Sequence, residues 1–242
     1  MAIWACSQPK AQPKQVRVAA ASDLSPALDE IGKKFKEQTG IEVVADAGST
    51  GLLAKQIEGG READLFLAAD VSYVERVVAA KACDRATQRS YGRGRITMWA
   101  RPGGAAPPAE VFDLTDARYA KIAIANPEHA PYGRAARDAL INAGIAISLE
   151  KRLVLAENVR LAFEYAQRGE VEVAIVARSL ALANPQGQAV DVPEAAHAPL
   201  EQALVVCGKG AGAAAGKKLA DFVLSPDGQA ILARYGFAPP AP

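Results

Sequence analysis

Short apolar runs alternate with amphipathic segments along this chain, and this alternation limits the folds that the chain can adopt. In the first block we expect strands at 16–20, 41–44 and 63–68, and helices at 26–39, 52–57 and 71–80. In the second block we expect strands at 122–125 and 173–176, and helices at 133–143 and 159–167. Such alternation is typical of parallel sheets covered by helices, so the sequence predicts an α/β fold.

The two blocks are joined by a strand expected at 95–100, followed by a loop at 101–108 rich in Pro and Gly. After the second block come a late strand at 202–206 and two terminal helices at 213–224 and 226–235. Two blocks with a late return indicate two lobes connected twice. We place the first lobe at 16–91 plus 204–242, the second at 92–203, and a signal remnant or tether at 1–15.

Four junctions between a strand and the next helix carry small or hydroxyl residues, at 20–23, 48–51, 129–133 and 157–159. A helix N-terminus exposes unpaired backbone N–H groups and roughly half a positive charge. Ligands of open α/β sheets bind outside the carboxyl ends of the strands. In a two-lobed protein, these junctions would meet in the cleft and form an anion-binding site.

The candidate donors are four hydroxyls and one backbone N–H group: Ser22, Ser49, Thr50, Tyr132 and the amide of Val159. A tetrahedral dianion without protons, such as molybdate, tungstate or sulfate, needs donors only, whereas hydrogen phosphate also needs an acceptor. Asp23 is the one acceptor beside this set. Each residue also has a structural alternative, because a hydroxyl residue before a helix often serves only as its cap. His129 is a further residue that could line the cleft.

Composition and motifs argue against several other classes. The 28 Lys and Arg residues are balanced by 27 Asp and Glu residues, so no basic stripe for nucleic acid is expected. The chain has no G-x-S-x-G nucleophile elbow and no P-loop lysine. We therefore expect no catalytic residues and no enzyme activity. With two histidines, we expect no metal site apart from the oxyanion itself.

Three cysteines raise questions about compartment. The run from Ile3 to Cys6 resembles the end of a bacterial lipoprotein signal, in which the cysteine is lipidated; the alternative is a plain linker. For Cys83 and Cys207 we expect buried free thiols, or a disulfide if the compartment is oxidising.

Motifs at six places occur together in one order, at 19–24, 48–57, 63–70, 126–133, 156–159 and 225–237. With these motifs the chain resembles the periplasmic molybdate-binding proteins of ABC importers. The resemblance implies a type II periplasmic binding fold, a periplasmic location, a membrane permease as partner, and molybdate or tungstate as ligand. It also matches Ser22 to a first-lobe serine, Thr50 to a second serine with Ser49 beside it, and Val159 to a residue that donates its backbone N–H. We expect a monomer.

Two departures from the family pattern concern tyrosines. Many members have a small residue where this chain has Tyr132, and a tyrosine where this chain has Ala177. We expect the Tyr132 hydroxyl to replace the missing one. The alternative functions are a receptor for another oxyanion (sulfate, phosphate or chromate), a cytoplasmic oxyanion-sensing domain, and a hydrolase.

Overall fold

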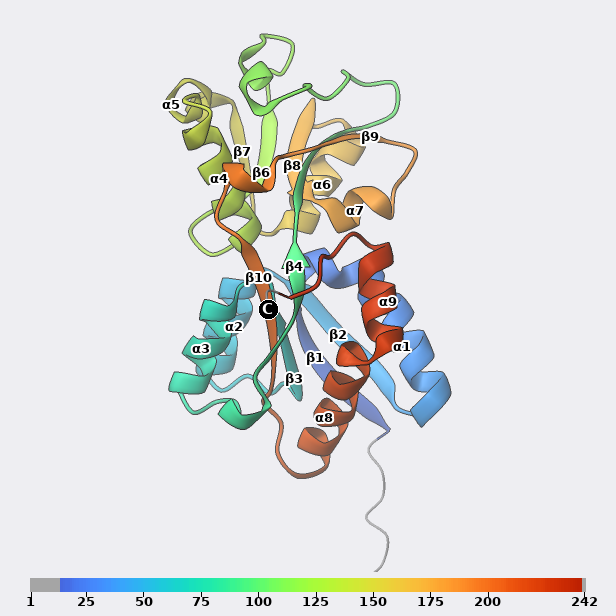
Figure 1. Cartoon of the computed structure of the whole chain (residues 1–242). Coiled ribbons are helices and arrows are strands. Elements are labelled where there is room, and N and C mark those ends of the chain that lie inside the picture. Colours follow the sequence, from blue (N-terminus) through green and yellow to red (C-terminus); the bar gives the residue numbers. More distant parts are fainter. Residues whose placement is uncertain (1–13, 241–242) are drawn as a thin grey trace, which may run out of the picture.

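Two five-stranded sheets, each covered by helices, form the molecule (Figure 1). The computed structural model describes residues 14–240. Cys6 and most of the expected tether therefore lie outside the described residues. Within the described part of the chain, no helix combines the length and the apolar character needed to cross a membrane.

The first sheet has the strand order β2-β1-β3-β10-β4. Its strands are β1 (Gln15–Ala21), β2 (Glu42–Gly48), β3 (Leu65–Ala68), β4 (Arg89–Gly94) and β10 (Leu200–Val206). β1 pairs in parallel with β2 and β3, and β10 runs antiparallel to β3 and β4. Successive side chains of β1 point to opposite faces of the sheet and pack into two hydrophobic clusters. Val16 and Val18 belong to the first cluster, and Ala19 belongs to the second.

Helices cover both faces of the first sheet. The first cluster is completed by α1 (Ser25–Thr39), α8 (Gly210–Leu224) and α9 (Pro226–Arg234). The second is completed by α2 (Thr50–Glu58) and α3 (Val71–Ala79). A short 3-10 turn, η1 (Ser22–Leu24), joins β1 to α1. A sheet covered on both sides explains why its strands read as continuous apolar runs.

The second sheet has the order β7-β6-β8-β5-β9. Its strands are β5 (Ile96–Ala100), β6 (Ile122–Ala125), β7 (Leu153–Ala156), β8 (Val173–Ala177) and β9 (Gln188–Asp191). Its helices are α4 (Pro131–Asn142), α5 (Ala146–Leu149), α6 (Val159–Arg168) and α7 (Arg178–Leu182). Trp99 and Phe163 pack at the centre of this core, with their ring centroids 4.6 Å apart.

The chain passes between the sheets twice: β4 leads into β5, and the segment after β9 returns into β10 (Figure 1). The predicted two-lobed α/β architecture is therefore confirmed. β10 begins at Leu200, so the boundary expected at 203/204 falls inside a strand. The lobe boundaries themselves stay a prediction.

Several elements differ from expectation. The sequence pattern did not predict β4, β7 and β9, which lie at sheet edges. β9 lacks the continuous apolar run of a central strand. β7 is apolar but only four residues long, and so short a run does not distinguish a strand from a helix. β4 contains two glycines and two arginines within six residues. The helix expected at 26–39 begins one residue earlier, because Ser25 is the first residue of α1, and the Ser25 hydroxyl donates to the Ser22 carbonyl oxygen.

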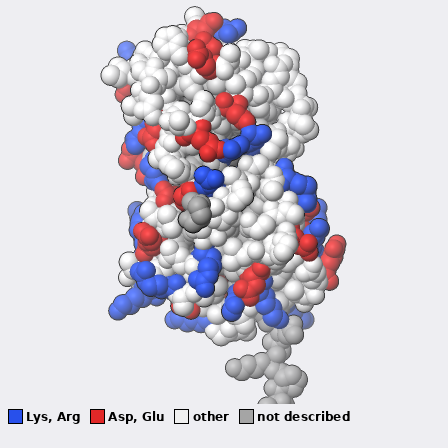
Figure 2. Space-filling model, viewed as in Figure 1, with Lys and Arg blue, Asp and Glu red and all other residues white. Residues whose placement is uncertain are grey.

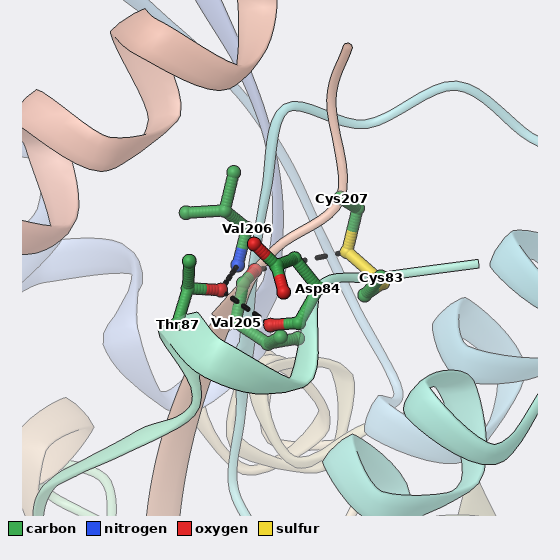
Figure 3. The surroundings of a disulfide bond; sticks show 6 residues. All are labelled: Cys83, Asp84, Thr87, Val205, Val206 and Cys207. Carbon is green, nitrogen blue, oxygen red and sulfur yellow. Dashed lines mark hydrogen bonds between the residues drawn. A yellow bond between two sulfur atoms is a disulfide. The ribbon is translucent and has the colours of Figure 1, made fainter. Parts of the chain in front are cut away.

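Cys83 and Cys207 form a disulfide, shown in Figure 3. The expectation of free thiols is therefore wrong, and the alternative holds. The bond joins the turn after α3 to the end of β10, two segments that backbone pairing already brings together. The Asp84 N–H donates to the Val206 carbonyl oxygen over 2.9 Å, and the Val206 N–H donates to the Thr87 hydroxyl over 2.9 Å.

Candidate anion-binding site between the lobes

Four helical segments follow, directly or after a short loop, the strand ends that face the space between the lobes. In the first lobe η1 follows β1 and α2 follows β2, and these two strands pair in parallel. In the second lobe α4 follows β6 and α6 follows β7, again a parallel pair. Parallel pairing brings the carboxyl ends of neighbouring strands to one edge of the sheet, so each lobe presents two helix N-termini at its edge.

A pocket lies where these N-termini meet, and it holds about 180 Å³ with its mouth included. Its lining combines backbone-rich positions, hydroxyls and one carboxyl: Ala21, Ser22, Asp23, Gly48, Ser49, Thr50, Ala69, Ala130, Pro131, Tyr132, Asn158 and Val159. All five candidate residues from the sequence are in this set. No lysine, arginine or histidine belongs to it among the residues that the structure describes.

Ser22 and Thr50 are buried and keep their hydroxyl hydrogens available. The Ser22 hydroxyl accepts a long hydrogen bond, 3.4 Å, from the Arg160 N–H, and the Thr50 hydroxyl accepts from the Ala69 N–H over 3.2 Å. Neither hydroxyl donates to another group in the described part of the chain. Val159 is the first residue of α6, so its N–H has no acceptor within its own helix. These three groups can therefore donate to a ligand.

Ser49 precedes α2 but makes no side-chain capping bond. Its hydroxyl lies 2.9 Å from the carbonyl oxygen and 2.8 Å from Nδ1 of His129, which belongs to the second lobe. The Gly51 N–H donates to the same carbonyl oxygen over 2.9 Å. The Ser49 hydroxyl is therefore bonded to the opposite lobe. His129 spans the cleft beside the pocket and is not one of the lining residues.

Tyr132 also bonds across the cleft. Its hydroxyl donates to Oδ2 of Asp23 over 2.9 Å, and Gln202 Nε2 donates to the same oxygen over 2.7 Å. The Tyr91 hydroxyl in turn donates to Gln202 Oε1 over 2.6 Å. Burial raises the pKa of Tyr132 well above its ordinary value. The Tyr132 hydroxyl, which we expected to donate to the ligand, therefore donates to Asp23 in this structure.

Asp23 is fully buried, and burial raises the pKa of its carboxyl from 3.8 to about 6, against the opposing effect of hydrogen bonds from Gln202 and Tyr132. Its second oxygen, Oδ1, has no hydrogen-bond partner within the described chain. Neither Gln202 nor Tyr91 was among the candidate residues predicted from the sequence. The available signal was the polar Gln202 inside the apolar run of β10, where it is completely buried.

Further bonds hold the two lobes together around the pocket. Arg134 of α4 forms an ion pair with Asp70 and donates to the Tyr73 hydroxyl over 2.6 Å, and both partners lie in or beside α3. The Ser179 hydroxyl also donates to the Asp23 carbonyl oxygen over 2.7 Å. The lobes are therefore joined by several bonds beside the pocket.

Two α/β lobes joined by two crossings, with a pocket of hydroxyl and amide donors between them, define a two-lobed ligand-binding protein. Residues 16–238 match the family model described as bacterial extracellular solute-binding protein. The chain belongs to this family, and the resemblance inferred from its motifs is confirmed.

Individual relatives agree with this assignment. The chain is 32% identical to the molybdate-binding protein ModA of Rhodobacter capsulatus, covering 92% of this chain and 88% of that protein. The same values apply to ModA of Escherichia coli. Among solved structures, the periplasmic molybdate-binding protein of Azotobacter vinelandii superimposes with a TM-score of 0.86 at 26% identity, covering 93% of this chain and all of that one. The type II periplasmic binding fold expected from the sequence is thereby confirmed.

Proposed function

We propose that this protein captures molybdate or tungstate between its lobes and delivers the anion to the membrane permease of an ABC importer. The observation that carries the proposal is the pocket itself, which gathers hydroxyls and helix N-termini from both lobes and has no lysine or arginine in its described lining. Such a lining neutralises an anion through dipoles and hydrogen bonds. The similarity to molybdate-binding relatives supports the choice of ligand.

The donors divide into two groups. Ser22, Thr50 and the Val159 N–H donate to the anion directly, because their hydrogens have no competing acceptor in the described structure. The hydroxyls of Ser49 and Tyr132 donate to acceptors on the opposite lobe, and they donate to the anion only after these bonds break. Both groups draw on both lobes, so the bound anion is enclosed only when the lobes close on it.

Ligand size and protonation set the expected selectivity. Molybdate and tungstate are close in size and charge, so they bind alike. Sulfate is smaller and leaves donors unsatisfied, at a cost of roughly 1–3 kcal/mol for each. Hydrogen phosphate needs an acceptor, and Asp23 is the observation that favours a phosphate receptor as the second candidate.

The remaining parts of the proposal concern context. As a solute carrier the protein has no enzymatic activity and works as a monomer in the periplasm. Figure 2 shows acidic and basic side chains interspersed on one face, without a single-sign patch suited to nucleic acid. A lipid anchor at Cys6 is part of the proposal, and that residue lies outside the described structure. The lobe boundaries near 91 and 203 belong to it as well.

Isothermal titration calorimetry with molybdate, tungstate, sulfate and phosphate tests the proposal. We expect one site that binds molybdate and tungstate at least about tenfold more tightly than sulfate. Ser22→Ala and Thr50→Val each remove one charge-assisted bond, so each weakens molybdate binding by about tenfold or more. Ser72→Ala, an exposed serine in α3, is the matched control and leaves the affinity unchanged. Phosphate binding as tight as molybdate binding would contradict the proposal.

A further inference from the structure

We propose that anion binding is coupled to the uptake of one proton by Asp23, whose Oδ1 then carries the proton and donates a hydrogen bond to the bound oxyanion. The inference rests on the proposed function and deepens it, because it makes Asp23 the residue whose protonation depends on the charge of the ligand. Without the proton, the carboxylate that lines the pocket would face a dianion.

The hydrogen bonds around Asp23 determine which oxygen takes the proton. Oδ2 already accepts from Gln202 Nε2 and from the Tyr132 hydroxyl. Tyr91 donates to Gln202 Oε1, which fixes the amide so that its N–H group points to Asp23. Oδ1 has no partner in the described chain. A proton on Oδ2 would compete with Gln202, which stays bonded there even after Tyr132 turns to the anion, whereas Oδ1 has no side-chain donor to displace.

The electrostatics favour the neutral acid. Burial raises the pKa of Asp23 to about 6, even though hydrogen bonds from Gln202 and Tyr132 oppose the shift. A dianion within a few ångströms raises the pKa further, because a like charge disfavours ionisation. Protonation removes that repulsion, and it also turns an acceptor into a donor, which is the only role that a fully deprotonated oxyanion can use.

No other charged group in the described surroundings takes over this role. The titratable groups that face Asp23 are Tyr132 of α4 and Tyr91 of β4, and burial raises the pKa of both. His129, before α4, is bonded to Ser49. Charged side chains on the neighbouring elements pair with one another instead: Arg160 with Glu164, Arg178 with Asp191, Arg61 with Asp46, Arg234 with Glu30, Arg93 with Glu201, and Arg134 with Asp70.

The proton balance is simple. One proton from solvent or buffer forms an O–H bond on Asp23, and no covalent bond of the anion forms or breaks. Affinity therefore falls as the pH rises above the pKa of the free site, by roughly tenfold for each pH unit. Asp23→Asn places a permanent N–H donor where the acid would carry its proton, so the variant binds molybdate with an affinity that does not change with pH.

The experiment is calorimetry with molybdate at about pH 7.5 in buffers of different ionisation enthalpy, which counts protons taken up on binding. We expect about one proton for the wild type and none for Asp23→Asn. Between about pH 6.5 and about pH 8, the wild-type affinity falls roughly 30-fold while that of Asp23→Asn stays within about twofold. Asp46→Asn, an exposed carboxyl of β2, is the control and keeps the wild-type proton count.

The outcomes separate the inference from the function on which it rests. Molybdate binding by the wild type without proton uptake overturns the inference and leaves the proposed function intact; this measurement needs no variant to fold. Tight binding of hydrogen phosphate, with Asp23 ionised and accepting the ligand's proton, overturns it as well. If molybdate, tungstate, sulfate and phosphate all fail to bind, the proposed function is overturned and the inference falls with it.

Discussion

Gly51 lies where the two lobes touch, and replacing it with alanine should hold them apart. Gly51 belongs to the first turn of α2 in the first lobe. A Cβ added there would lie 2.5 Å from the His129 carbonyl oxygen of the second lobe and 3.0 Å from the Tyr73 hydroxyl. The first distance is about 0.9 Å shorter than the 3.4 Å of ordinary contact. Gly51→Ala therefore conflicts with the closed arrangement and leaves α2 itself intact.

The magnitude follows from the bond that the conflict breaks. Moving His129 away costs the 2.9 Å bond from the Gly51 N–H, whereas the Ser49 hydroxyl has already exchanged His129 for the anion in the bound state. At about 0.5–1.5 kcal/mol for this bond, molybdate binding weakens roughly 2- to 13-fold. The helix, in contrast, gains about 0.5–1 kcal/mol from alanine, so the variant should fold at least as well as the wild type.

Calorimetry gives the affinity, and small-angle scattering gives the compaction that molybdate causes. We expect Gly51→Ala to bind weakly and to remain extended at ligand concentrations that compact the wild type. Gly59→Ala, at the end of the same helix, is the matched control, because its Cβ meets its nearest neighbours at 3.4 Å, within its own helix. Molybdate affinity within about twofold of the wild type, with normal compaction, would refute the closure argument.

Three further predictions concern other parts of the molecule. Arg134→Met removes the ion pair to Asp70 across the cleft, so molybdate should dissociate several-fold faster in stopped-flow experiments; an unchanged rate would count against this contact. Burial raises the pKa of Asp23 from 3.8 to about 6, so the folded state loses stability as the pH rises through this range. Asp23→Asn should therefore gain up to about 3 kcal/mol relative to the wild type between about pH 4 and about pH 6 in urea unfolding, and equal pH profiles would contradict it. Replacing both Cys83 and Cys207 with serine opens a crosslink with a sequence separation of 124. This should cost about 2–5 kcal/mol of unfolding free energy, with molybdate affinity retained.

The central strands could be predicted from the sequence, whereas three of the four edge strands could not. Strands such as β3 and β8 are buried on both faces, so each reads as an uninterrupted apolar run. β4 does not, because it lies at the sheet edge and has glycine at position 94. A Cβ at Gly94 would collide with the Tyr132 hydroxyl and approach Gln202 Nε2, so contacts with distant residues decide the identity of this residue.

In the site, as in the sheets, features set by local sequence could be predicted, whereas contacts between distant residues could not. The strand-to-helix junctions predicted that Ser22, Thr50 and Val159 lie at the pocket, because local sequence sets where a helix begins. What these junctions could not reveal is which hydroxyls donate to the protein itself. The bond between Tyr132 and Asp23 joins residues 109 positions apart, and Gln202 is 179 positions from Asp23. Such pairings depend on how the lobes pack, so no pattern of neighbouring residues in the sequence predicts them.

A crystal structure grown with tungstate tests the central claim most directly, since the anomalous scattering of tungsten locates the ion without bias from the protein coordinates. The account predicts one strong peak between the lobes, enclosed by Ser22 and Thr50 on one side and Tyr132 and Val159 on the other. A peak held by residues of one lobe only, or elsewhere on the surface with this pocket lacking one, would contradict it.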